Sequence, residues 1–194
     1  MRLEKTAATS RVFWHRIAMP VLDEALGQRA VVCRAIGARD PRICKRRDNV
    51  TNDILAGSAE KWFGALTGLL EQFTGVKDSV YKNADYVIPG WCPVDVKWTE
   101  YTTPGCHLPV YDNEELHEDW AYQLMSGPEP EYWDPAGWMM GSEVATYPVE
   151  KTPYGLQRRV PSRRLHPFEE MWLRTPRGKG FLKMLRTFGL TEAL

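Results

Sequence analysis

The sequence predicts an α/β fold in which a mixed β-sheet is flanked by helices. A helical pattern of apolar residues runs from residue 50 to 73, and short strand patterns separated by turns follow it. An amphipathic helical pattern lies near the end of the chain, at residues 180–188. A chain of 194 residues with 43% hydrophobic residues can bury a sizeable core, so we expect a single domain over residues 1–194.

The first 49 residues are expected to form a helical and basic extension. Ser10 is a suitable N-cap for a helix over residues 11–26. Residues 30–36 fit either a short helix or a strand, and residues 37–49 are typical of a basic loop.

The segment 50–171 is expected to form the core. Its helix, with small residues around Ala59, would lie close against a sheet. Because short turns separate the strands that follow, we expect an antiparallel meander. A turn or helix from Ser162 toward Trp172 leads into a C-terminal helix within residues 172–194. The expected strands and extended segments are residues 77–81, 84–88, 92–101, 106–110, 120–126, 132–140 and 153–160.

Charge is unevenly distributed although the formal net charge is zero. Residues 29–47 and 158–186 are strongly basic, whereas residues 112–150 are acidic, with a polar loop at 111–118 that we expect to be solvated. This segregation fits a phosphate-binding rim around a cation-binding centre. It fits equally well basic and acidic segments that pair with each other across the fold.

Several classes of protein lack a signal in the sequence. No apolar run is long enough to cross a membrane and no signal-peptide core is present, so we expect a cytoplasmic protein without a membrane partner. Phosphate-loop and Gly-x-Ser-x-Gly motifs are missing, which argues against a nucleotide cofactor and against esterase chemistry. The four cysteines form no Cys-x-x-Cys pair, so reduced thiols are expected.

The stretch from Val94 to Thr99 carries the first chemical signal. It alternates as a strand does, so Asp95 and Lys97 point to one face, about 6–7 Å apart along the strand. Burying that face requires the two charges to pair or to meet a third charge. A divalent cation bound by Asp95, with Lys97 beside the same phosphate, would supply that charge; a plain surface strand is the alternative.

Two further acids extend this pattern. Glu60 lies on the helix at 50–73, and Asp85 lies on the strand that precedes Asp95. If a turn at Pro89 and Gly90 joins the two strands, the carboxylates of Asp85 and Asp95 lie close together and repel each other. Mg²⁺, for which Mn²⁺ can substitute, would remove this conflict because it binds carboxylate and phosphate oxygens.

This order of residues resembles the motif of the PD-(D/E)XK nuclease superfamily, which has the restriction-endonuclease-like fold. The chain has Glu60 on a helix, Asp85 on one strand and Asp95-Val96-Lys97 on the next. The resemblance continues through DVKWTEY, HLPVY, DWAYQLMSG and VPSRRLHPFEEM, covers residues 50–171, and is to small members of phage or mobile-element type.

The resemblance implies a Mg²⁺-dependent DNA endonuclease. Asp85 and Asp95 would be metal ligands, together with the carbonyl of Val96, and Glu60 would bind a metal directly or through water. Lys97 would orient the attacking water or stabilise the pentavalent phosphate. Ala84 precedes Asp85 where the superfamily has proline, which leaves open that another acid is the ligand.

DNA is the partner that the resemblance implies, and an enzyme of this kind that cuts both strands is expected to be a homodimer. Trp120, Trp133 and Trp138 fit base stacking, but tryptophans on strands favour the core. A non-catalytic DNA-binding protein or a phage assembly protein that retains the nuclease fold is the alternative. The residues expected to contact DNA are Arg39, Arg42, Lys45, Arg46, Arg47, Arg158, Arg159, Arg163 and Arg164.

Overall fold

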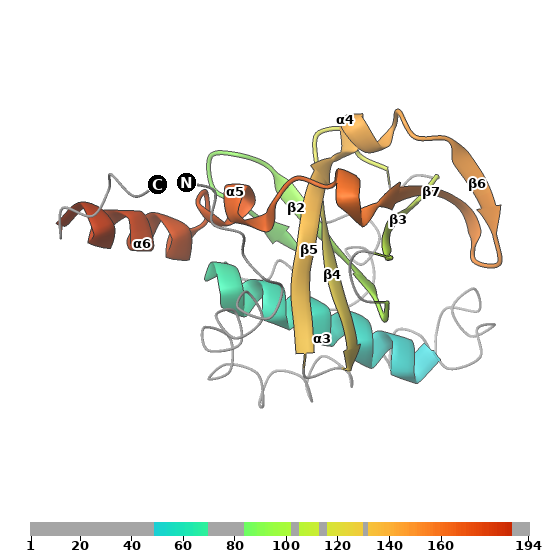
Figure 1. The fold of residues 1–194 in the computed structure, drawn as a ribbon, viewed down its shortest axis with the longest axis horizontal. Helices are drawn as coiled ribbons and strands as arrows, with labels where there is room; N and C mark the ends of the chain where they lie inside the picture. Colours follow the sequence, from blue (N-terminus) through green and yellow to red (C-terminus); the bar gives the residue numbers. More distant parts are fainter. Residues whose placement is uncertain (1–48, 70–83, 102–104, 113–115, 130–131, 188–194) are drawn as a thin grey trace.

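The computed structural model describes residues 49–69, 84–101, 105–112, 116–129 and 132–187. These residues form a mixed α/β structure with two β-sheets flanked by helices (Figure 1). The predicted helix at 11–26, the segment 30–36 and the strand at 77–81 lie outside the described residues. Among the described helices, none is both long and apolar enough to span a membrane.

Helix α3 spans Asn49–Thr67 and confirms the position of the predicted long helix, although it ends earlier than residue 73. Gly68 has a φ of +70°, and its amide donates a hydrogen bond to the carbonyl of Gly64, which ends the helix with a left-handed residue. The Thr67 hydroxyl donates to the Phe63 carbonyl at 2.7 Å in the same last turn.

Sheet A has four strands in the order β1-β2-β4-β5. Strands β1 (Tyr86–Val87) and β2 (Pro93–Thr99) pair in antiparallel fashion, as do β4 (Ala121–Glu129) and β5 (Tyr132–Met140). The pairing of β2 with β4 is parallel. The predicted antiparallel meander is therefore wrong, because β3 leaves the sheet between β2 and β4.

Sheet B is antiparallel and has three strands in the order β3-β7-β6. Strand β3 (His107–Tyr111) and strand β7 (Gly155–Pro161) match two predicted segments. Strand β6 (Val149–Thr152) was not predicted from the sequence, because its residues lack the alternation of a half-buried strand and three of the four are exposed. Figure 1 shows the hairpin of β6 and β7 projecting from the rest of the molecule.

Helix α3 covers one face of sheet A, running across its strands (Figure 1). Val94 and Val96 of β2 pack on this side with Phe63 of the helix, and the Trp133 indole on β5 donates a hydrogen bond to the Ser58 hydroxyl at 2.9 Å. Among the apolar residues of this helical pattern, Trp62, Phe63 and Leu66 are buried within α3, and Leu69 is buried just after its end.

A second core lies between the two sheets. Tyr122 and Leu124, which alternate along β4 with the residues that face α3, pack against the inner face of sheet B. We call this group the inter-sheet core. Its buried members are Cys106, Leu108, Val110, Tyr122, Leu124, Met139, Val144 and Val160.

The C-terminal segment closes the α3 side of the molecule. Helix α4 (Gly141–Val144) follows β5, and a 3₁₀ turn (Ser162–Arg164) and helix α5 (Phe168–Trp172) follow β7. The Trp172 indole donates to the carbonyl of Leu66 at 2.8 Å, which ties α5 to α3. Helix α6 (Pro176–Thr187) extends away from the body (Figure 1) and begins four residues before the predicted C-terminal helix.

Candidate active site

Strand β2 presents two chemically different faces, as its alternation predicted. Val94 and Val96 are buried on the side of α3, whereas Asp95 and Lys97 are partly exposed. In the parallel register with β4, Asp95 lies beside Tyr122 and Lys97 beside Leu124. Because neighbours in a ladder share a face, Asp95 and Lys97 lie on the face of sheet A that looks toward sheet B.

Asp95 and Lys97 form an ion pair with each other. The Nζ of Lys97 lies 2.9 Å from Oδ2 of Asp95, and the two side chains are 20% and 15% exposed, respectively. An ion pair at this partial burial is held by the strand itself, because residues two apart on a strand point the same way. The charges thus meet the pairing requirement expected for this face.

Asp85 lies against the centre of this strand. Its Oδ2 accepts a hydrogen bond from the main-chain amide of Val96 at 2.7 Å. Tyr86 is the partner of Val94, and extending that antiparallel register by one residue sets Asp85 beside Asp95. The structure therefore brings Asp85, Asp95 and Lys97 together around Val96, as the sequence predicted.

Glu60 approaches the same region through its main chain. The Tyr86 hydroxyl donates a hydrogen bond to the Glu60 carbonyl at 2.7 Å, and Tyr86 directly follows Asp85. Gly64 permits this approach, because a Cβ there would lie 2.7 Å from the Tyr86 hydroxyl oxygen. The Glu60 residue is only 8% exposed. In the described ranges, no three Asp, Glu, His or Cys side chains gather closely enough to hold an ion.

The two aspartates still suit a hard divalent cation. Mg²⁺ is bound in proteins by one or two carboxylates and takes its remaining ligands from water and phosphate. Asp85 and Asp95 are partly exposed and supply only oxygen. Asp85 directly precedes β1, which pairs with the strand that carries Asp95, and the Val96 carbonyl belongs to the residue between Asp95 and Lys97. These residues therefore fit the ion by donor type and by placement.

The predicted DNA contacts divide into two groups in the described residues. Arg158 is used internally, because Nη2 and Nε lie 2.8 and 3.1 Å from Oδ1 of Asp112 and Nη1 donates to the carbonyls of Ala145 and Tyr147. Asp112 was expected to be solvated and instead holds this arginine. Arg158 therefore has a structural role. Outside the described residues lie Arg39, Arg42, Lys45, Arg46 and Arg47.

Three exposed arginines remain as candidate phosphate contacts. Arg159 is exposed on β7, and Arg163 and Arg164 are exposed on the 3₁₀ turn that follows. These arginines affect the pKa of His107 on the neighbouring strand β3. Burial lowers its pKa, Arg159 and Arg163 lower the pKa further, and Glu150 opposes them. The end of β7 and the turn that follows it therefore carry a cluster of positive charge.

Two of the three tryptophans expected in the core are buried, and Trp120 is half-buried at the edge of the inter-sheet core. Trp133 is 2% exposed and Trp138 is 7% exposed, which confirms the core interpretation over base stacking. Trp120 stacks on His117 with ring centroids 3.9 Å apart.

No family model, curated protein or solved structure matches the chain. The fold defines the class as a mixed α/β protein, and the functional interpretation comes from the chemistry of the residues around Val96.

Proposed function

We propose that the chain is a Mg²⁺-dependent nuclease that hydrolyses DNA phosphodiester bonds, with a restriction-endonuclease-like core. The observation that carries this proposal is the meeting of Asp85, Asp95 and Lys97 at Val96. The Asp85 carboxylate accepts a hydrogen bond from the Val96 amide at 2.7 Å. On either side of Val96, Asp95 and Lys97 form an ion pair with an N–O distance of 2.9 Å. Two carboxylates and one amine at one strand are the groups that phosphodiester hydrolysis needs.

Asp85, Asp95 and the Val96 carbonyl would hold the ion, and Glu60 would act from α3. When bound, the ion supplies positive charge to the phosphate oxygens and helps water to attack phosphorus. The reaction forms one phosphorus–oxygen bond to the water and breaks one to a sugar oxygen.

Lys97 has a separate task. Its ammonium now pairs with Asp95, and a cation bound to that carboxylate would compete for the same oxygen. Lys97 would then turn to the phosphate, where its ammonium donates hydrogen bonds to an oxygen that gains negative charge in the transition state. Arg159, Arg163 and Arg164 would hold the DNA backbone.

One observation favours a second candidate, a DNA-binding or assembly protein that keeps this fold without catalysis. The ion pair between Asp95 and Lys97 already satisfies both charges without a cation. In that case the two residues are a structural pair, and Arg159, Arg163 and Arg164 alone would contact DNA.

Nicking of supercoiled plasmid separates the two candidates. We expect the wild-type chain to nick the plasmid with Mg²⁺ or Mn²⁺ and to stop in EDTA. Asp95→Asn and Lys97→Ala are each expected to reduce the rate by roughly 100-fold or more. Glu170→Gln, which changes an exposed acid on α5, is the matched control and is expected to cut normally. Retention of DNA without cutting under every metal would favour the non-catalytic candidate.

A further inference from the structure

The β6–β7 hairpin carries an unusual share of exposed apolar surface. Six large apolar side chains are exposed in the described part of the chain, and three of them lie here. They are Val149 at 39%, Tyr154 at 65% and Leu156 at 53% exposed. The hairpin also projects from the body (Figure 1). Apolar groups gathered on a projecting element indicate a surface that binds something.

The exposed apolar side chains continue the inner face of sheet B. Along β7, Val160 is buried in the inter-sheet core, and Leu156 lies on the same face because strand residues alternate. Arg158 lies between them and closes the core through Asp112. Val149 is the partner of Arg158, so it shares this face. Among the described residues, none covers this face along the hairpin, although the same face of sheet B is turned toward Asp95 and Lys97 in the body.

The charge around this apolar surface is positive. Apart from Arg158, which pairs with Asp112, residues 149–164 contain four basic residues and one acid, Glu150. Lys151 lies opposite Leu156 on the inner face, and Arg159 is exposed on the outer face. Apolar side chains bordered by cations suit a polyanion that also offers apolar contacts, which describes the groove of a nucleic acid.

A second copy of this chain is a poorer occupant. Two β6 strands that pair symmetrically must be antiparallel and must keep their faces aligned. The two registers that use most of β6 then place Glu150 opposite its own copy or Lys151 opposite its own copy. Like charges directly opposite each other destabilise an antiparallel pair. The edge of β6 therefore disfavours its own copy.

We propose that the β6–β7 hairpin enters the major groove of duplex DNA. This inference rests on the proposed nuclease function and adds that the substrate is double-stranded. The major groove, about 12 Å wide, admits a two-stranded β-ribbon. Tyr154 and Leu156 contact base edges and thymine methyl groups, while Lys151 and Arg159 contact the phosphates on the two sides of the groove.

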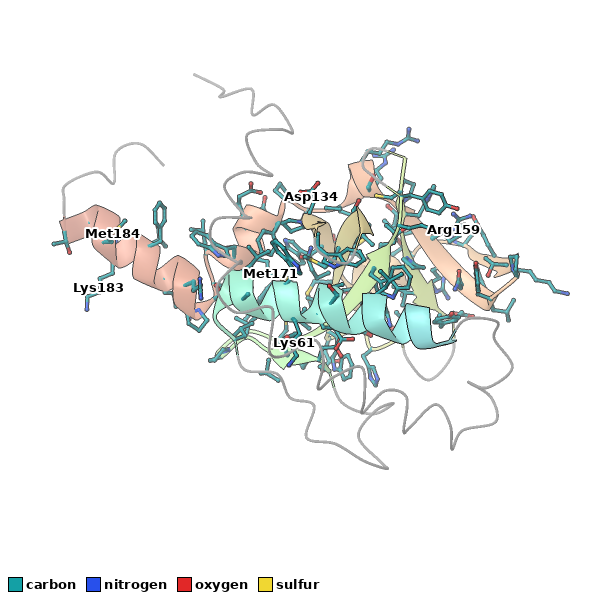
Figure 2. The ribbon with its side chains drawn as sticks, turned by 90° about the horizontal axis from the view of Figure 1, so that it is seen from below. Lys61, Asp134, Arg159, Met171, Lys183 and Met184 are labelled. Atoms are coloured by element: carbon teal, nitrogen blue, oxygen red, sulfur yellow. The ribbon has the colours of Figure 1, made fainter. Side chains whose placement is uncertain are left out.

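The test compares binding of duplex and single-stranded DNA of the same sequence, in EDTA so that no strand is cut. The double variant Tyr154→Ser/Leu156→Ser removes the apolar tip, and both positions are exposed, so folding is preserved. Met184→Ser is the matched control, because Met184 is 47% exposed on α6. Figure 2 shows α6, with Met184, at the opposite end of the molecule from Arg159.

We expect the double variant to bind the duplex roughly tenfold more weakly, with single-strand affinity and the Met184→Ser control unchanged. Three results would each overturn the hairpin's role. In the first, the double variant binds duplex DNA as tightly as the wild-type chain does; in the second, it loses as much affinity for single strands as for the duplex; in the third, the wild-type chain does not bind the duplex. A wild-type dimer that the double variant dissociates would also overturn it, in favour of self-association. Plasmid nicking by the wild-type chain is read separately, so failure of the hairpin and failure of the nuclease assignment are distinguishable.

Discussion

The carboxylate of Asp85 accepts a hydrogen bond from the main-chain amide of Val96, the residue between the ion-paired Asp95 and Lys97. This contact gives Asp85 a structural role that is separable from its proposed role as a metal ligand. Asp85→Ala leaves a part-buried amide without its acceptor and is expected to lower the free energy of unfolding by about 1–3 kcal/mol. Asp85→Asn keeps an acceptor oxygen and should cost less.

Urea unfolding measures the stability difference, and plasmid nicking measures activity. Both Asp85 variants are expected to lose cleavage, whereas only Asp85→Ala loses most of the stability. Normal cleavage by a folded Asp85→Asn variant would remove Asp85 from the metal ligands.

Arg158 is expected to matter for stability. Its guanidinium joins Asp112 to the carbonyls of Ala145 and Tyr147, so Arg158→Ala leaves three acceptors without their donor. We expect a loss of roughly 2 kcal/mol or more in the free energy of unfolding, measured in urea. Arg158→Lys should restore only part of it, because an ammonium cannot span this fork of acceptors. Unchanged stability in Arg158→Ala would contradict this role.

Arg159 and Arg163 are expected to act on DNA affinity. Both are exposed, so Arg159→Ala and Arg163→Ala should leave the urea midpoint unchanged. Each replacement removes one phosphate contact and should lower the slope of log affinity against log salt by about 1. The measurement is a salt titration of duplex binding by fluorescence anisotropy. Slopes equal to that of the wild-type chain would place the phosphate contacts elsewhere.

The lowered pKa of His107 is expected to make the free energy of unfolding depend on pH in mild acid. Burial lowers its pKa below the usual value of 6.5, and Arg159 and Arg163 add to this effect against Glu150. The unfolded chain therefore takes up the proton first as the pH falls. The stability from His107 is complete above pH 6.5, falls as the pH drops below 6.5, and levels off below the folded-state pKa. Thermal melts of wild-type and His107→Gln chains should diverge in this window and agree above it.

The raised pKa of the Cys92 thiol is expected to make the free energy of unfolding fall as the pH rises in alkali. Burial raises the pKa of its thiol from 9.0 to about 11. The folded state keeps the proton longer, so this contribution to stability is complete below pH 9.0 and is lost as the pH rises toward 11. A Cys33→Ser/Cys44→Ser/Cys106→Ser chain leaves Cys92 as the sole thiol. Iodoacetamide at pH 8 should modify it slowly when folded and rapidly in urea; fast modification of the folded chain would contradict its burial.

The local features of the site could be predicted from sequence because they depend on short-range rules. Alternation along β2 set the faces of Asp95 and Lys97. The turn at Pro89 and Gly90 joined β1 to β2, and Gly90 adopts a φ of +77° there. These two facts place Asp85 beside Asp95.

The pairing of distant strands could not be predicted in the same way. Nothing local to β2 indicates that its second neighbour is β4 in a parallel register, since 21 residues separate them and β3 departs to the other sheet. Strand β6 could not be predicted because most of its side chains are exposed, so its sequence shows no apolar periodicity. The role of Arg158 depended on a partner 46 residues away, which a count of basic residues cannot reveal.

The excursion of β3 has a consequence for any shortened form of the chain. Leu108 of β3 pairs with Val160 of β7. All four strands of sheet A precede β7 in the sequence. A polypeptide that stopped after Met140 would possess every strand of the sheet that bears the aspartates, yet it would leave β3 without its ladder and open the inter-sheet core to water. Excising the segment up to Met140 should therefore yield an unstable, aggregating fragment instead of a minimal folded unit.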